Sequence, residues 1–378
     1  MQVIQLAKKV TGAGRKPVLR FAVLGAGNGG LAMAGHLALL GHPVVLYNRS
    51  PAKLEALAAG GIHLEGCLEG FGSLQGMTGS LAEAAAFGDV LMIVVPATGH
   101  RDLARGLAPH LRDGQVVVLN PGRTLGAVEF EYTLREEGCC ARVIVAETQT
   151  LLYASRVVGP GRVHIFSLKQ RVPVATLPGR EAPRVVDLLR EAFPQMVTAA
   201  HVLQTGLDNI GAIFHPAPVL MNLARIEEGH AFDYYHEGIT PAAARLLETM
   251  DGERLAVATA LGVEAVSARQ WLAEAYGAGG RDLYEAIRHT PAYRGIKAPG
   301  SLDTRYILED VPMSLVPISS LGAMLGVATP AIDSVITMAG AIYGMDFRGR
   351  GRTVERLGLT GLSLAELYDY VLEGREVA

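Results

Sequence analysis

The sequence predicts an α/β doubly wound sheet followed by a mostly α-helical second domain. From residue 18 onward, short apolar runs alternate with helical patterns, whereas beyond about residue 200 the strand signals fade and helical spacing of apolar residues continues. A chain of 378 residues is also too long for one ordinary core. We therefore expect an N-terminal extension at 1–17, a sheet domain at 18–199 and a helical domain at 200–378.

The strands of the first domain are predicted from apolar runs that are continuous enough to be buried on both faces, as in a parallel sheet. These runs occupy 19–25, 43–49, 89–96, 115–120 and 142–147, with further strand candidates at 163–169 and 172–178. Between them, Ser50 and Pro51 can begin a helix that Gly60 and Gly61 can end. The pattern at 180–193 predicts the last helix before the change of period.

The helices of the second domain are predicted from capping residues and apolar spacing. Thr240 and Pro241 are a typical N-cap and first-turn pair, and the helical pattern that follows them reaches Gly262. Similar patterns occur at 264–276 and 362–373. The sequence has no low-complexity linker between the two halves, so the boundary is marked only by a change in the spacing of apolar residues.

Composition excludes several function classes. The formal net charge is −3 and the 34 basic and 37 acidic residues are interspersed, so no basic surface for nucleic acid or anionic membranes is expected. The apolar runs are far shorter than the roughly twenty residues of a membrane helix. Three cysteines, Cys67, Cys139 and Cys140, have no zinc-site spacing, so we expect no metal and a reducing cytoplasm.

A glycine motif follows the first predicted strand and opens a helix. Gly25 permits a tight turn, Gly27 lets the backbone approach a pyrophosphate, and Gly30 allows close packing of helix and strand. Free N–H groups at the helix start favour phosphates. The motif predicts a Rossmann-type dinucleotide site, the alternative being a glycine-rich turn that has lost its ligand. The expected cofactor residues are Gly25, Ala26, Gly27, Asn28, Gly29, Gly30, Asn48, Arg49 and Pro96.

The end of the second predicted strand indicates which coenzyme binds. An acidic residue there would accept bonds from the ribose 2′-hydroxyl, but this chain has Asn48, Arg49 and Ser50, which suit a 2′-phosphate. We therefore favour NADP(H), with NAD(H) open. The alternative is that Arg49 is a solvated surface arginine.

Evidence for a specific function has to be sought in the second half, because Rossmann-type domains occur in many proteins of unrelated function. Unusual stretches there are NIGAIFHPAPVLMN (209–222), FDYYHEGITP (232–241), LLETMDGERLAVATALG (246–262) and TRYILEDVPMSLVPISSLG (304–322). Three stretches of the first half are considered with them: GAGNGGLAMAGHLA (25–38), NPGRTLGAVEF (120–130) and AETQTLLYASR (146–156). Together they resemble the octopine/nopaline dehydrogenase family, the opine dehydrogenases, over nearly the whole chain after about residue 18.

The resemblance implies an activity and a catalytic pair. Enzymes of this family join the amino group of an amino acid to the carbonyl of a 2-oxo acid such as pyruvate and reduce the imine with a nicotinamide coenzyme. The product is an N-(carboxyalkyl)amino acid, and the reverse oxidation also occurs. The family uses a histidine and an aspartate of the helical domain, which fall on His215 and Asp310.

The residues around His215 support this assignment by their own chemistry. Pro216 disfavours a helical conformation at His215, and Pro218 removes another backbone donor, so a helix should kink or begin here and expose the imidazole to a cleft. Histidine can give and take protons near neutral pH, and an aspartate on its other nitrogen would fix the tautomer. The alternative is a core histidine bonded to a backbone carbonyl.

Further substrate contacts are expected around this pair. Arg305 stands five residues before Asp310, and its forked guanidinium suits a substrate carboxylate. Its alternative is an ion pair with Glu309 or Glu237. Residues matching family motifs expected to line the cleft are Asn222, Tyr235 and Thr150.

Two other functions stay open at this point. The first is a ketopantoate-reductase-like or hydroxyacid dehydrogenase that reduces a 2-oxo acid without an amine. Such enzymes usually use a lysine, and because the second half contains only Lys297, this function would rest on His215. The second is a non-catalytic NADP-binding sensor or assembly module. A homodimer through the apolar second half is one option for assembly.

Overall fold

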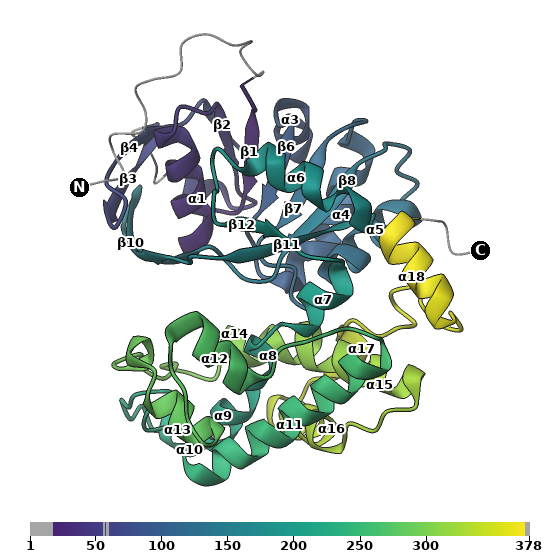
Figure 1. Cartoon of the computed structure of the whole chain (residues 1–378). Coiled ribbons are helices and arrows are strands. Elements are labelled where there is room, and N and C mark those ends of the chain that lie inside the picture. Colours follow the sequence, from purple (N-terminus) through teal and green to yellow (C-terminus); the bar gives the residue numbers. More distant parts are fainter. Residues whose placement is uncertain (1–17, 56, 58–59, 375–378) are drawn as a thin grey trace.

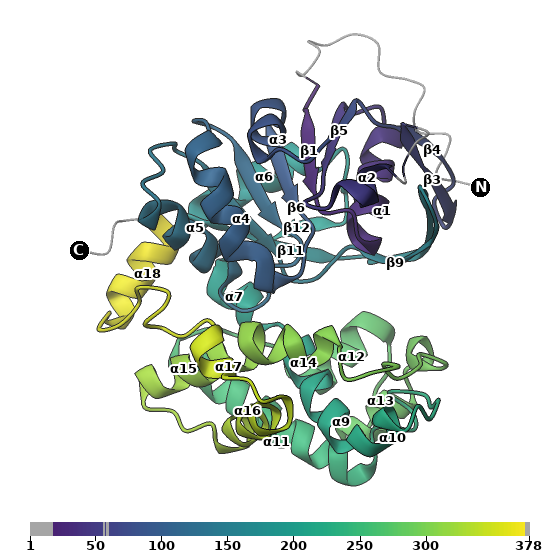
Figure 2. The same cartoon turned by 180° about the vertical axis from the view of Figure 1, so that it is seen from behind.

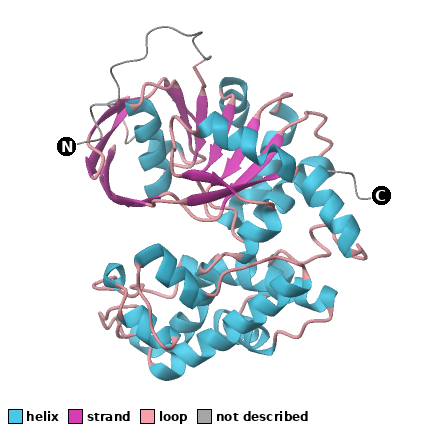
Figure 3. Ribbon diagram, viewed as in Figure 1, coloured by secondary structure: helices cyan, strands magenta, loops and turns pink. Residues whose placement is uncertain are grey.

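The computed structural model describes residues 18–55, 57 and 60–374 and shows a sheet domain stacked on a helical domain (Figure 1). Every named strand lies before residue 199, so the lower domain is built from helices and loops (Figure 3). The extension expected at 1–17 lies outside the described residues. Among the helices described, none combines the length and apolar character needed to cross a membrane.

The main sheet of the first domain has eight strands in the order β12-β11-β8-β7-β6-β1-β2-β5. Their bounds are β1 Phe21–Leu24, β2 Val44–Tyr47, β5 Gly76–Thr78, β6 Val90–Ile93, β7 Val116–Leu119, β8 Ile144–Thr148, β11 Val172–Leu177 and β12 Met196–Thr198. All neighbours run parallel except β11, which is antiparallel to β8. The predicted all-parallel sheet is therefore mixed at this end. Between β8 and β11 the chain forms an antiparallel hairpin at residues 153–168. A hairpin reverses the chain direction, whereas a crossover helix would have kept β11 parallel to β8.

A second sheet of four strands, in the order β4-β3-β10-β9, was not predicted as a separate layer. Its strands are β3 Gly61–Gly66, β4 Gly70–Ser73, β9 Tyr153–Gly159 and β10 Arg162–Leu168, and of these only β10 carried a strand signal. The others are rich in glycine or exposed polar residues and have no continuous apolar run. Small residues allow close packing here, since a Cβ on Gly72 would come within 2.3 Å of the carbonyl oxygen of Gly35.

Helices cover both faces of the main sheet. They are α1 Asn28–Leu39, α2 Pro51–Glu55, α3 Leu81–Phe87, α4 His100–Leu107, α5 Gly126–Glu136 and α6 Ala182–Leu189. Alternate strand residues enter separate cores: Val23 and Met92 pack with α1, α6 and the small sheet, whereas Leu24 and Leu91 pack with α3, α4 and α5. Helix α6 is in front in Figure 1, and α4 and α5 are in front in the reverse view of Figure 2.

The second domain is a bundle of short helices around one long helix. Its helices are α7 Val202–Leu207, α8 Gly211–Phe214, α9 Pro216–Met221, α10 Leu223–Glu227, α11 Pro241–Ala260, α12 Ala268–Tyr276, α13 Leu283–Arg288, α14 Arg305–Leu308, α15 Val316–Leu325, α16 Pro330–Tyr343, α17 Phe347–Arg350 and α18 Leu364–Glu373. The predicted start of α11 is confirmed, because the Thr240 side chain accepts a hydrogen bond from the Ala243 N–H. Helix α18 returns to the sheet domain, where Glu373 pairs with Arg180 (Figure 1).

Buried polar residues join the two domains. Arg352, which follows α17 and is fully buried, donates from Nε to Glu129 of α5 at 2.8 Å and from a terminal nitrogen to the carbonyl oxygens of Gly122 and Thr124. Glu147 of β8 accepts a bond from the Thr205 hydroxyl of α7 at 2.6 Å. Burial raises the pKa of Glu147 to about 7, although this bond opposes the shift. Each domain therefore satisfies buried polar groups of the other.

Replacing Arg352 with Met should lower the free energy of unfolding by about 3–5 kcal/mol, because Glu129 would stay buried without its partner. Urea denaturation of the full chain measures this change. The matched control is Arg184→Met, because Arg184 is exposed and its ion pair with Glu181 should contribute less than about 1 kcal/mol. Equal denaturation midpoints for the two variants would show that the buried pair contributes no more to stability than a surface pair.

Candidate active site

The loop between β1 and α1 has the features that a dinucleotide requires. Gly25 has a φ of +122°, and a Cβ there would lie 2.4 Å from the Val94 carbonyl oxygen. A Cβ on Gly30 would lie 1.8 Å from the Gly25 carbonyl oxygen, whereas one on Gly27 would meet nothing within 4 Å. The outer glycines are therefore required by packing, and the middle one leaves open space for a ligand to approach the backbone.

The start of α1 is available to phosphates. Its N-cap, Gly27, has no side chain to satisfy the first N–H groups, which favour an anion together with the helix dipole. Asn28 ties the loop to the small sheet, since its Oδ1 accepts a bond from the Val157 N–H at 2.9 Å. Gly29 packs against Leu151, where a Cβ would come within 2.8 Å of the side chain. These residues fit a dinucleotide pyrophosphate.

The end of β2 presents Arg49 to solvent beside this loop. Asn48 accepts a bond from the Ala26 N–H at 3.1 Å and donates to the Ser50 carbonyl oxygen at 3.0 Å, so it shapes the loop. Arg49 is exposed and, among the described residues, forms no hydrogen bond or ion pair. Pro96, also exposed, follows β6 and precedes the 3-10 turn Ala97–Gly99.

The predicted break at His215 is present, because α8 ends at Phe214 and α9 begins at Pro216. The His215 Nδ1 lies 2.8 Å from Asp310 Oδ2, although the two residues are 95 positions apart. The Tyr306 ring stacks on the imidazole with a centroid distance of 4.1 Å and an interplanar angle of 8°. The structure thus brings together the two residues that the family resemblance named and fixes the orientation of the imidazole.

Asp310 is fully buried and lies just before a π-helical turn, Val311–Leu315. Its Oδ1 is 3.1 Å from an Arg123 terminal nitrogen and 3.3 Å from the Ser314 hydroxyl. Burial alone would raise the pKa of Asp310, but the positive charge of Arg123 and the interaction with His215 outweigh it and hold the pKa below its usual value. Asp310 is therefore an anion that can stabilise a protonated His215.

Arg123 is the main residue of this site that the sequence analysis missed. It lies in the loop between β7 and α5 with a φ of 61°, and its Nε is 3.4 Å from Glu309 Oε1. The same Glu309 oxygen accepts a bond from the Ala97 N–H at 2.9 Å. A left-handed backbone conformation is uncommon for a residue other than glycine, and here it accompanies a side chain that faces two carboxylates. The stretch 120–130 carried the family signal, but the motif alone did not indicate this role.

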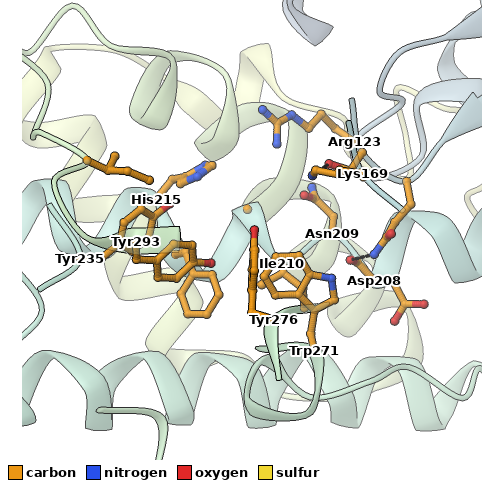
Figure 4. A pocket seen from close by; sticks show the side chains of 15 residues that line it. Arg123, Lys169, Asp208, Asn209, Ile210, His215, Tyr235, Trp271, Tyr276 and Tyr293 are labelled. Atoms are coloured by element: carbon orange, nitrogen blue, oxygen red, sulfur yellow. Dashed lines mark hydrogen bonds between the residues drawn. The ribbon is translucent and has the colours of Figure 1, made fainter. Parts of the chain in front are cut away.

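A cavity of about 250 Å³ lies between the domains next to His215 (Figure 4). Residues from both domains line it: Arg123, Gln149, Thr150, Lys169, Asp208, Asn209, Ile210, Gly211, Phe214, His215, Tyr235, Trp271, Tyr276, Tyr293 and Ile296. Predicted residues His215, Tyr235 and Thr150 are among them. No cluster of three or more histidine, cysteine or acidic side chains suited to a metal occurs in the part of the chain described.

Two predicted substrate residues lie outside the lining of this cavity. Asn222 is buried, and its Nδ2 donates to the carbonyl oxygens of Pro218 and Gly238 at 2.9 and 2.8 Å, as a structural residue would. The Arg305 side chain is 67% exposed and lies 3.5 Å from Glu309, which is the ion pair given above as its alternative. The positive charge of Arg305 nevertheless helps to lower the pKa of Asp310, so Arg305 lies near the His215–Asp310 pair.

Comparison with known proteins decides the family. The profile described as NAD/NADP octopine/nopaline dehydrogenase, alpha-helical domain, matches residues 198–343, and that of the NAD binding domain of 6-phosphogluconate dehydrogenase matches residues 20–127. An opine dehydrogenase from Arthrobacter sp. (strain 1C) is 41% identical over 91% of this chain and 96% of its own length. The chain belongs to the opine dehydrogenase family. It is therefore an NAD(P)-dependent oxidoreductase that acts on a carbon–nitrogen bond.

Solved structures agree on the fold. An octopine dehydrogenase in complex with NADH and L-arginine superposes with a TM-score of 0.80 at 22% identity, covering 95% of this chain and 99% of that one. A yersinopine dehydrogenase with bound NADP+ gives 0.71 at 18% identity, with 94% and 98% covered. A 2-dehydropantoate 2-reductase from Geobacter metallireducens gives a lower TM-score of 0.63 at 18% identity, with 86% and 100% covered. The predicted two-domain plan is confirmed, and the simple 2-oxo acid reductase remains a relative in fold only.

If His215 transfers protons, His215→Ala should lower kcat by about 100-fold or more while coenzyme binding persists. Steady-state kinetics and fluorescence titration of the coenzyme measure the two effects separately. His230→Ala is the control, since the His230 side chain is exposed and pairs with Glu228 at 3.4 Å. Turnover of the His215 variant near the wild-type rate would leave the imidazole a purely structural role.

Proposed function

We propose that this enzyme condenses an amino acid with a 2-oxo acid and reduces the resulting imine in the cavity between its domains. The observation that carries the proposal is the 2.8 Å contact between His215 and buried Asp310 at the wall of that cavity, in a chain of the opine dehydrogenase family. The bound dinucleotide supplies the hydride for the reduction, and the loop around Gly27 together with Arg49 would hold it.

His215 is suited to move the protons of the condensation. Its Nδ1 is engaged by Asp310, whereas its Nε2 has no hydrogen-bond partner among the described residues. Nε2 can therefore take a proton from the attacking amine and return one to the hydroxyl that leaves as water. The negative charge of Asp310 stabilises the imidazolium between these steps, and Tyr306 keeps the ring in its plane by stacking.

Arg305 is proposed to bind the carboxylate of the amino acid. It begins α14, close to the His215–Asp310 pair, and its exposed guanidinium is held only by Glu309 among the described residues. A bidentate contact with a carboxylate would be stronger than this 3.5 Å ion pair. Solvent exposure also leaves the side chain free to turn toward a substrate.

The cavity wall favours an amino acid with a large apolar side chain. The helical domain contributes mostly aromatic and aliphatic groups to the lining, namely Ile210, Phe214, Tyr235, Trp271, Tyr276, Tyr293 and Ile296. The Tyr235 and Tyr293 rings stack with a centroid distance of 3.9 Å, which makes this part of the wall rigid. Asp208 is the one acidic group among the described lining residues, and it would repel an acidic side chain.

Oxidation of the reduced coenzyme should require both substrates together, because the hydride acceptor exists only after condensation. The measurement is a rate matrix of pyruvate and other 2-oxo acids against large apolar, basic and acidic amino acids. Turnover should appear in pairs, be fastest with large apolar amino acids and be nearly absent with single additions. Reduction of an oxo acid alone as fast as any pair would instead assign the reaction to the hydroxyacid class.

The coenzyme is proposed to be NADP(H), on the basis of exposed Arg49 at the end of β2 and the absence of an acid there. Arg49→Ala should weaken NADPH binding by about 10-fold or more and leave NADH binding nearly unchanged, because only NADPH carries the 2′-phosphate. Equilibrium titration of both coenzymes against wild type and variant measures this difference. Equal losses for the two coenzymes would contradict the assignment.

A further inference from the structure

Lys169 is a second cation of the cavity that the sequence analysis did not single out. It directly follows β10, and its Nζ donates to the Thr150 hydroxyl at 2.5 Å. Both residues line the cavity beside His215, and in Figure 4 the ends of Arg123 and Lys169 lie near each other. The sheet domain thus brings two positive charges to a space whose opposite wall is largely aromatic.

The two cations differ in their compensation. Arg123 faces two carboxylates, at 3.1 Å from Asp310 and 3.4 Å from Glu309. The Lys169 ammonium has no carboxylate within ion-pair distance among the described residues, and its hydrogen-bond acceptor there is the neutral Thr150 hydroxyl. Burial, with a further contribution from Arg123, lowers the pKa of Lys169 to about 8. A partly buried cation without an anion is a costly arrangement unless a ligand supplies the opposite charge.

We propose that Lys169, positioned by Thr150, binds the carboxylate of the 2-oxo acid. This inference rests on the proposed condensation and names the substrate group that Lys169 recognises. The carbon that accepts the hydride is C2 of the former oxo acid, and its carboxylate is one bond away. That carboxylate must therefore lie on the side of the dinucleotide-binding domain. Of the described cavity residues from that domain, Lys169 is the cation that no carboxylate neutralises.

The test uses oxamate, a stable analogue of pyruvate, titrated calorimetrically into the enzyme saturated with NADPH. Lys169→Met should raise the dissociation constant for oxamate by about 30-fold or more while the dissociation constant for NADPH changes less than about twofold. Lys169→Arg, which keeps the charge, should recover most of the affinity. Lys297→Met is the matched control, because Lys297 is exposed, pairs with Asp233 at 2.7 Å and is not among the residues that line the cavity.

The pH dependence gives a readout that a structural role would not change. Oxamate binds the protonated lysine, so its dissociation constant in the wild type should be lowest below pH 8 and rise above it as Lys169 loses its proton. The Lys169→Met variant should lack this rise. Both proteins keep the other titratable groups of the described lining, which are Arg123, Asp208, His215, Tyr235, Tyr276 and Tyr293. The difference between the two profiles therefore reports Lys169.

Oxamate binding requires neither an amino acid nor turnover, so it tests Lys169 independently of the condensation. A silent rate matrix would defeat the proposed reaction, whereas tight oxamate binding lost in Lys169→Met would still support the carboxylate site. Equal oxamate affinity in wild type and Lys169→Met, or no measurable affinity in the wild type, would overturn the inference. A variant that binds oxamate normally but has a reduced kcat would overturn it too, by making Lys169 a proton-transfer group.

Discussion

The buried carboxylate of Asp310 is the constraint on which the active site depends. An isolated carboxylate in a protein interior is strongly unfavourable, so it has to be paired and hydrogen-bonded. Here the partners come from both domains: Arg123 from the loop after β7 and His215 from the break between α8 and α9. Because the carboxylate needs both, the orientation of the imidazole and the position of the sheet domain against the helical domain are coupled.

Other buried polar groups at the domain junction are also paired with residues of the opposite domain. Arg352 of the second half lies fully buried against Glu129, and Glu147 accepts a bond from Thr205 at the first helix of the second half. Such groups give little net stability compared with apolar packing, but removing one partner is costly. They therefore specify one relative placement of the domains. That placement holds the cavity between His215 and the loops that follow β7 and β8 of the sheet domain.

The sequence predicted the elements whose signals are local. The apolar runs of β1, β2, β6, β7 and β8, the N-cap of α11 and the helical pattern of α18 were predicted correctly, because burial, end-capping and helical spacing leave marks within a few residues. The glycine-rich strands β3 and β4 leave no such mark and were missed.

The site shows the same division between local and distant information. His215 and Asp310 were paired by family resemblance, since no periodicity relates residues 95 positions apart. Arg123 and Lys169 are single polar residues in loops after strands, where composition carries no period, so only the folded chain brings them together. The positive charges near the cavity differ in how they are paired, which suggests a different role for each. Arg123 faces Asp310 and Glu309, so under the proposals above Lys169 and Arg305, which is only 3.5 Å from Glu309 and mostly exposed, would bind the two carboxylates of the condensed substrate. With one cation bound at each end, the proposed substrate would present the nitrogen between its carboxylates to His215.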